Sequence, residues 1–217
     1  MELCNRKINA IIFDLDGTLL ASTNIWGKID QEFFGKRGME IPPTYAKEIA
    51  HIGLMEASVL TQKKYCPNEK AEDILKEWQE GTKHHYEQLI QLKPYVIELL
   101  EKLKKENVKL AVATANDRAL YEPCLKRLKI YDYFSIIVDV DTVKSGKNSV
   151  KIYDYIAEKL NEKRENIAVF EDIYVGLKTA YEHGYLTVGV YDEHSCKDEE
   201  LVKRYSHKFI KSFKEIL

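Results

Sequence analysis

Short apolar runs recur along the chain, and amphipathic segments separate them. The runs lie at residues 8–13, 108–114, 134–140, 167–172 and 186–191. Their length and their Ile and Val content predict β-strands that are buried on both faces. Between the runs, apolar residues recur at helical spacing in segments 96–103, 120–128, 150–160 and 175–181. Strands and helices that alternate in this way predict an α/β fold, a doubly wound parallel sheet of the Rossmann-like type.

One stretch interrupts this alternation directly after the first run. From residue 22 to residue 91 no strand pattern occurs, and helical patterns occupy residues 29–39, 44–65 and 71–92. No Pro- or Gly-rich linker and no internal repeat marks its borders. We therefore expect a small all-helical cap domain, residues 22–91, inserted into a core made of residues 1–21 and 92–217.

Composition and charge narrow the class of protein. The 217 residues are 45% hydrophobic and 31% charged, as in ordinary globular proteins, and the net charge of -2 provides no field for nucleic acid or a membrane surface. No apolar run approaches the roughly 20 residues of a membrane span, and the N-terminal segment lacks the apolar region of a secretory signal. Four scattered cysteines indicate reduced thiols. We expect a cytoplasmic protein, monomeric or weakly homodimeric.

Two aspartates, Asp14 and Asp16, follow the first apolar run, and Gly17 comes next. In a doubly wound sheet, the carboxyl ends of the strands form the edge where ligands bind. Two carboxylates so close together repel each other, and a bound cation relieves that repulsion. Oxygen ligands suit Mg²⁺, which also holds phosphate oxygens, and Gly17 allows a tight turn. The pattern therefore indicates a site for Mg²⁺ and phosphate.

The sequence Asp-Leu-Asp-Gly-Thr at residues 14–18 resembles the first signature of the haloacid dehalogenase-like hydrolase superfamily. Three further signatures occur in order: Thr114 ends the next core strand, Lys147 opens a later helix, and Glu171-Asp172 follows another strand. The resemblance extends over essentially the whole chain. The position of the insert is similar to that in the helical-cap members, which include phosphoglycolate phosphatases and β-phosphoglucomutases.

This resemblance implies a role for each matching residue. Asp14 would be the nucleophile that forms an aspartyl phosphate, and Asp16 would be the general acid and base, with a raised pKa. The groups implied as Mg²⁺ ligands are the Asp14 side chain, the Asp16 carbonyl, Asp172 and, directly or through water, Glu171. The residues implied for phosphoryl binding are Thr114, Asn116 and Lys147.

Two positions depart from the pattern of the family. The lysine signature usually reads G-K-P-x-P, whereas Asn148 and Val150 replace both prolines here. Lys144 and Lys151 are therefore alternatives to Lys147. The acidic pair usually precedes Ser, and Ile173 occupies that position.

The residues that face the substrate would lie on the cap. Segment 51–56 resembles the cap loop of the phosphatases and mutases, in which mutases use an Arg to grip a second phosphate. Glu56 occupies that position here and would repel a second phosphate, which favours a phosphatase. His51, Glu56 and Trp26 are candidates for contact with the substrate.

These observations lead to one functional prediction and three alternatives. We expect a Mg²⁺-dependent phosphatase that hydrolyses a small phosphorylated metabolite. Asp16 can protonate a departing alcohol, whereas a departing halide needs no proton, so phosphate esters are favoured over carbon–halogen bonds. A phosphomutase of the β-phosphoglucomutase type is the first alternative. The remote alternatives are a non-catalytic phosphate-binding protein and a receiver-like signalling domain.

Overall fold

The computed structural model describes residues 1–193 and 198–217. A six-stranded sheet with the order β5-β4-β3-β6-β7-β8 forms its centre, and every neighbouring pair in it is parallel. The strands are β3 (Ala10–Phe13), β4 (Lys109–Thr114), β5 (Ile136–Asp139), β6 (Ile167–Glu171), β7 (Leu186–Val190) and β8 (Lys208–Ile210). The predicted doubly wound parallel sheet is therefore confirmed.

Three short strands were not predicted. Strand β8 pairs with β7 at the sheet edge, where Val190 lies opposite Ile210. Strands β1 (Glu2–Leu3) and β2 (Arg6–Lys7) form a separate antiparallel hairpin at the N-terminus. Each of these strands has two or three residues, which is too short for an apolar period to stand out.

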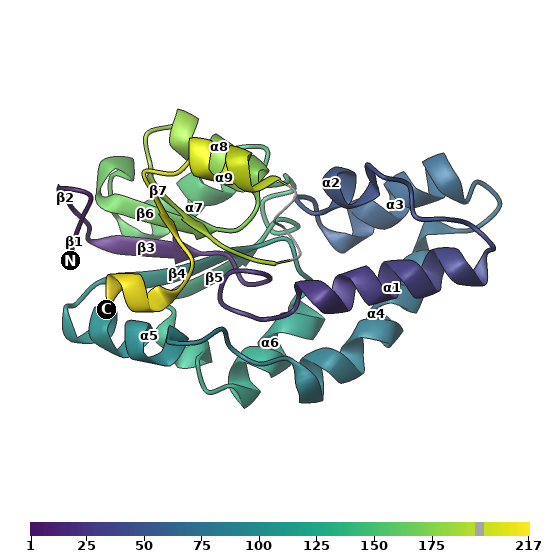
Figure 1. Cartoon of the computed structure of the whole chain (residues 1–217), viewed down its shortest axis with the longest axis horizontal. Helices are drawn as coiled ribbons and strands as arrows, with labels where there is room; N and C mark the ends of the chain where they lie inside the picture. Colours follow the sequence, from purple (N-terminus) through teal and green to yellow (C-terminus); the bar gives the residue numbers. More distant parts are fainter. Residues whose placement is uncertain (194–197) are drawn as a thin grey trace.

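Helices cover both faces of the sheet (Figure 1). The helices of this part are α5 (Val96–Lys105), α6 (Arg118–Arg127), α7 (Lys151–Leu160), α8 (Tyr174–Glu182) and α9 (Glu199–Arg204). The 3-10 turns are η2 (Tyr131–Tyr133), η3 (Arg164–Asn166) and η5 (Phe213–Ile216). Alternate residues of β3 serve the two faces: Ile11 and Phe13 pack with α5, whereas Ile12 packs with α7. This two-residue period explains why the strand is apolar throughout.

A helical part lies between β3 and α5 in the chain and projects beyond one end of the sheet (Figure 1). It consists of α1 (Thr23–Lys36), α2 (Tyr45–Ile49), α3 (Leu54–Tyr65), α4 (Ala71–His84) and the π-helical turn η1 (His85–Leu89). The predicted helical pattern at residues 44–65 is thus two helices. The all-helical insert is confirmed, and the domain bounds 22–91 stay a prediction.

Aromatic packing and one ion-pair network stabilise this helical part. Phe33 makes an edge contact with Trp78, and Phe34 makes one with Tyr45, with ring centroids 5.6 and 4.8 Å apart. Arg37 donates to both carboxylate oxygens of Glu69, at 2.7 and 2.6 Å. These contacts join α1 to α2, the α3–α4 turn and α4. The buried apolar residues of the insert are continuous with the hydrophobic core on one face of the sheet.

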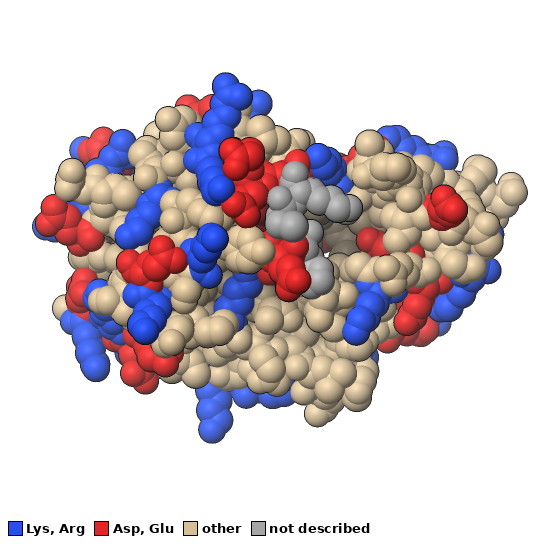
Figure 2. All heavy atoms as spheres, viewed as in Figure 1, with Lys and Arg blue, Asp and Glu red and all other residues tan. Residues whose placement is uncertain are grey.

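The surface matches the charge composition. On the face shown in Figure 2, basic and acidic side chains are interspersed, and the surface is hollowed between the sheet part and the helical part. Within residues 1–193 and 198–217, no helix is both long and apolar enough to cross a membrane. Cys4, Cys66 and Cys124 are free thiols, and Cys196 lies outside the described residues.

Candidate active site

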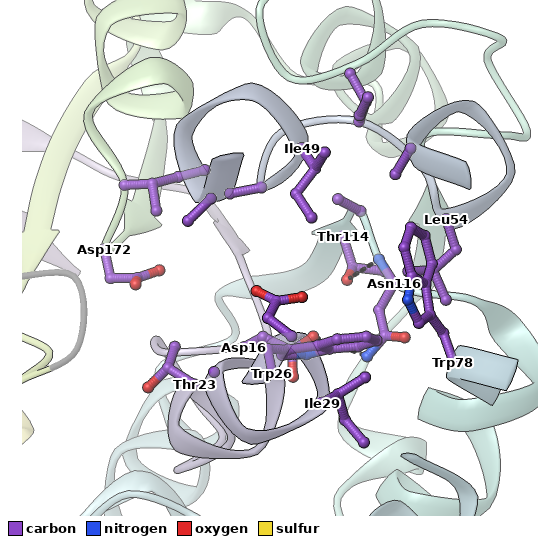
Figure 3. A pocket seen from close by; sticks show the side chains of 18 of the residues that line it. Asp16, Thr23, Trp26, Ile29, Ile49, Leu54, Trp78, Thr114, Asn116 and Asp172 are labelled. Atoms are coloured by element: carbon purple, nitrogen blue, oxygen red, sulfur yellow. Dashed lines mark hydrogen bonds between the residues drawn. The ribbon is translucent and has the colours of Figure 1, made fainter. Parts of the chain in front are cut away.

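The carboxyl ends of three neighbouring strands bring the predicted residues to one place. Asp14 directly follows β3, Thr114 ends β4, and Glu171 ends β6. A pocket of about 550 Å³ opens here, between the strand ends and the helical part. Of the predicted site residues, those lining it are Asp14, Asp16, Trp26, Thr114, Asn116, Lys147, Glu171 and Asp172. Figure 3 labels five of them, Asp16, Trp26, Thr114, Asn116 and Asp172.

A tight turn after β3 places the first two aspartates. Gly17 has a φ of 83°, a conformation that favours glycine, and its amide donates to the Leu20 carbonyl at 3.0 Å. A Cβ atom at Gly17 would collide with the carboxylate of Asp172. The turn therefore lets the backbone pass directly against Asp172, where a side chain would be strained.

Asp14, Glu171 and Asp172 form a buried acidic cluster, with one carboxylate oxygen of each within 4.8 Å of the others. Burial, and next the charge of Glu171, raise the pKa of Asp14 to about 8 although Lys147 opposes this rise, so a further cation is needed to favour the anion. A donor set made only of oxygen atoms suits a hard divalent cation. The residues present therefore fit a divalent metal ion.

Lys147 is 2% exposed and contacts two members of this cluster. Its ammonium group donates to Asp14 and, at 2.8 Å, to Glu171. Burial opposes its positive charge, but the carboxylates of Asp14 and Glu171 outweigh that effect and raise the pKa of Lys147. Lys147 is therefore a cation held against the predicted nucleophile.

The chain reaches this arrangement without the two usual prolines. Lys147 lies in the turn before α7 instead of opening the helix, because α7 begins at Lys151. Its backbone amide donates to the His51 carbonyl at 2.8 Å, so the cap holds this turn in place. Lys144 and Lys151 are exposed and do not line the pocket formed by the described residues.

Asp16 is held by three donors. The Ser22 hydroxyl donates to Oδ1 at 2.5 Å, the Tyr86 hydroxyl donates to the same oxygen, and the Asn116 amide donates to Oδ2 at 2.8 Å. Burial raises the pKa of Asp16, and the hydrogen bonds from Ser22, Tyr86 and Asn116 partly offset this rise. A raised pKa is what a general acid requires, because the group must carry a proton near neutral pH.

Ser22 and Tyr86 were not predicted as site residues. Ser22 lies within reach of the first signature, six positions after Asp16, and a search for hydroxyl groups near it would have found it. Tyr86 is 70 positions from Asp16 and belongs to no motif. Only the folded cap brings it to the site.

Thr114 and Asn116 are hydrogen-bonded to each other, and Asn116 also contacts Asp16. Thr114 is 1% exposed, and its Oγ1 accepts from the Asn116 backbone amide at 3.0 Å. The Asn116 side chain, expected to bind phosphate, gives its described hydrogen bond to Asp16. The position of Asn116 therefore supports a role in orienting Asp16 more than a role in binding phosphate.

The three cap candidates have different positions. Trp26 lines the pocket (Figure 3). His51 lies in the turn between α2 and α3, where its carbonyl group faces Lys147, and Glu56 is exposed on the first turn of α3. Neither is among the described residues that line the pocket, because this turn packs against the Lys147 segment.

Several polar contacts close the cap onto the core. Gln79 of α4 donates to Asp117 at 2.5 Å, and Lys47 of α2 pairs with Asp198 at 2.7 Å. Close approach at Gly53, where a Cβ atom would meet the carboxylate of Asp141, adds a third contact. These contacts hold the cap over the strand ends, next to the pocket.

Residues 11–190 match the family of haloacid dehalogenase-like hydrolases. The phosphorylated carbohydrates phosphatase of Thermotoga maritima is 31% identical over 188 residues, with 82% of each chain covered. Crystalline CbbY from Rhodobacter sphaeroides, in complex with phosphate, superposes with a TM-score of 0.81 at 23% identity, with 96% of each chain covered. β-Phosphoglucomutase from Clostridium difficile superposes with a TM-score of 0.80 at 22% identity, covering 97% of this chain and 93% of that chain. The chain therefore belongs to the haloacid dehalogenase-like hydrolases, in the helical-cap group that resembles phosphoglycolate phosphatases and β-phosphoglucomutases.

Proposed function

We propose that the chain is a Mg²⁺-dependent phosphatase that hydrolyses a small phosphate monoester through an aspartyl phosphate. The observation that carries this proposal is the pairing of Asp14, held against Lys147, with Asp16, whose burial raises its pKa. One carboxylate is then suited to attack and the other to transfer a proton. The phosphatase of Thermotoga maritima, at 31% identity, supports the reaction class.

In the first step a carboxylate oxygen of Asp14 attacks phosphorus, and the bond from phosphorus to the ester oxygen breaks. The Asp16 carboxylic acid gives its proton to the departing alcohol. In the second step Asp16, now a carboxylate, takes a proton from water, whose oxygen attacks phosphorus. The bond to Asp14 then breaks and inorganic phosphate leaves.

Other residues stabilise the charge that moves during these steps. The ammonium of Lys147 and the hydroxyl of Thr114 lie at the strand ends, where the transferring phosphoryl oxygens would be bound. Lys147 also favours the anionic, nucleophilic form of Asp14. Tyr86, Ser22 and Asn116 hold the Asp16 carboxyl group in place.

The metal would be held by Asp14, the Asp16 carbonyl and Asp172. When bound, Mg²⁺ neutralises negative charge on the phosphoryl group and its acidic ligands. Both carboxylate oxygens of Glu171 already have partners, since Oε2 accepts from Lys147 and Oε1 accepts the amides of Asp172 and Ile173. Glu171 would therefore act by holding Lys147 and through water, not as a direct ligand.

Hydrolysis is favoured over the phosphomutase alternative by the charges around the pocket. A mutase must bind a second phosphate, but none of the described residues that line the pocket is an Arg. Lys28 is the cap-side cation among them, and it is exposed. Incubation with a hexose phosphate separates the two functions, because a phosphatase releases inorganic phosphate and a mutase produces an isomer.

The decisive experiment follows p-nitrophenyl phosphate hydrolysis with Mg²⁺, with EDTA, and in Asp14→Asn. We expect activity that EDTA abolishes and Mg²⁺ restores, and less than a few per cent of it in Asp14→Asn. Asp132→Asn, at an exposed carboxylate of η2 that does not line the described pocket, is the matched control. Substantial activity in Asp14→Asn would remove the nucleophile assignment.

A further inference from the structure

The cap side of the pocket has an apolar and aromatic lining. The strand ends supply the charged groups described above, whereas the helical part supplies mainly apolar residues, the largest of which are Trp26, Ile29, Ile49, Ile52, Leu54 and Trp78. Figure 3 labels all of these except Ile52. They come from α1, α2, the α2–α3 turn, α3 and α4, so all sides of the insert contribute. The alcohol part of a bound phosphate ester would lie against these residues.

Polar groups on this side are few and do not suit a sugar. A polyhydroxylated alcohol loses water at every hydroxyl on binding and needs several donors and acceptors in return. Asn24, Lys28 and Gln31 are exposed, and the hydroxyl of Thr23 already donates to Asp192 at 2.7 Å. Asp30 is half-buried, and burial raises its pKa to about 7, so its environment disfavours a charge. An apolar group can displace water from this wall without leaving hydroxyl groups that lack hydrogen-bond partners.

The two tryptophans are fixed in position by the chain itself. The Trp26 indole donates to the Tyr86 hydroxyl at 2.9 Å. The Trp78 ring is 2% exposed and packs edge-on against Phe33. Rigid indole rings of this kind bind flat aromatic groups with little loss of entropy.

The Trp78 indole offers one more feature. Its Nε1 atom is buried and has no hydrogen-bond partner among the described residues, although the side chain lines the pocket. A buried donor without an acceptor is unfavourable, and a ligand oxygen or nitrogen would remove that cost. The pocket therefore combines an apolar wall with a single unsatisfied donor.

We propose, building on the phosphatase function above, that the substrate is the monophosphate of a flat aromatic or heteroaromatic alcohol whose ring packs against Trp26 and Trp78. The ring lies between the cap residues, and its phosphorylated hydroxymethyl group reaches Asp14. The volume of about 550 Å³ accommodates a ring system together with the phosphate.

A pair of primary alkyl phosphates tests the substrate class without differences in leaving-group reactivity. We expect kcat/KM for 2-naphthylmethyl phosphate to exceed that for glucose 6-phosphate by at least about ten-fold, as burial of a ring implies. Equal values, or a preference for the sugar phosphate, would overturn the proposal. If p-nitrophenyl phosphate is also inert, the phosphatase function has failed, and binding then decides the inference.

Binding can be followed without turnover, because Trp26 and Trp78 are the only two tryptophans of the chain and both line the pocket. We expect 2-naphthylmethyl phosphonate to change their fluorescence and to bind at least ten-fold more tightly than glucose 6-phosphonate. Weaker or equal binding of the naphthyl compound would contradict the proposal regardless of catalysis.

Variants test the residues. Trp78→Ala should weaken binding of the naphthyl phosphonate by about ten-fold or more, and Ile49→Asn, which makes the wall polar without removing an indole, by several-fold. Tyr181→Ala, at an aromatic residue that is 42% exposed and does not line the pocket, should leave it unchanged. If both pocket variants bind normally, the cap wall does not receive the alcohol group.

Discussion

The Tyr86 hydroxyl donates a hydrogen bond to the Asp16 carboxylate, which joins the helical cap to the proposed general acid and base. Trp26 in turn donates to the Tyr86 hydroxyl at 2.9 Å. A residue of the pocket wall is thus two hydrogen bonds away from the group that transfers the proton. We infer that the position of the cap and the orientation of Asp16 depend on each other.

Removal of this contact should reduce proton transfer to poor leaving groups. We expect Tyr86→Phe to lower kcat for an alkyl phosphate by about ten-fold, the effect of losing a hydrogen bond to a charged group. The loss for p-nitrophenyl phosphate should be smaller, because its leaving group needs the proton less. Tyr185→Phe, which removes a buried hydrogen bond to Asp154 away from the pocket, is the control. Equal losses on both substrates would argue against a role through Asp16.

Lys147 should matter for stability as well as activity. Lys147→Met leaves Asp14 and Glu171 buried without their cation, and we expect the free energy of unfolding to fall by about 3 kcal/mol. Activity should fall below about one per cent, because the phosphoryl group loses its charged partner. Urea unfolding without metal and a phosphate-release assay measure the two effects. Lys144→Met and Lys151→Met, at exposed positions, should change neither stability nor activity. If one of them is inactive, that lysine and not Lys147 binds the phosphoryl group.

Asp30 should make stability depend on pH. Its carboxyl group has a pKa of about 7 when folded, because burial disfavours the anion, against 3.8 as the ordinary value. Between these values the folded chain binds more protons than the unfolded chain, so this group lowers stability as pH rises through that window.

The Asp30→Asn variant removes this contribution. We expect it to unfold like the original chain near pH 4 and to be more stable by about 1 to 2 kcal/mol at pH 8, allowing for partial exposure to solvent. Urea titrations at several pH values measure the difference. Glu32→Gln, at an exposed position of the same helix, controls for the loss of a carboxylate from α1. A constant difference across the pH range would contradict the assignment.

Gly17 should not tolerate a side chain. We expect Gly17→Ala to lose most of the activity and about 1 to 3 kcal/mol of stability, because its φ is 83° and the new methyl group would meet Asp172. Gly35→Ala in α1, where a Cβ meets no atom within 4 Å, should instead raise stability by up to about 1 kcal/mol. Thermal unfolding and phosphate release report on both. An active Gly17→Ala would show that the turn can relax.

The location of the core strands followed from local pattern. Runs such as 108–114 are apolar because both faces of the sheet are covered, and the two-residue alternation of Ile11 and Ile12 toward opposite cores confirms that reason. The short strand β8 has no such pattern, since it lies at the edge and has three residues. Its place is determined by pairing with β7.

The convergence of Asp14, Thr114 and Glu171 was predictable from sequence, because each lies at the carboxyl end of a parallel strand and such ends share one edge. The environment of these residues was not. Tyr86 reaches Asp16, and the His51 carbonyl holds the Lys147 turn, only after the insert folds over the sheet. Neighbouring residues in the sequence determine strands, helices and turns. A contact such as that of Tyr86 with Asp16, which are 70 positions apart, depends on how the helical insert packs on the sheet. The tertiary structure therefore decided what the pocket is lined with and what orients its acid.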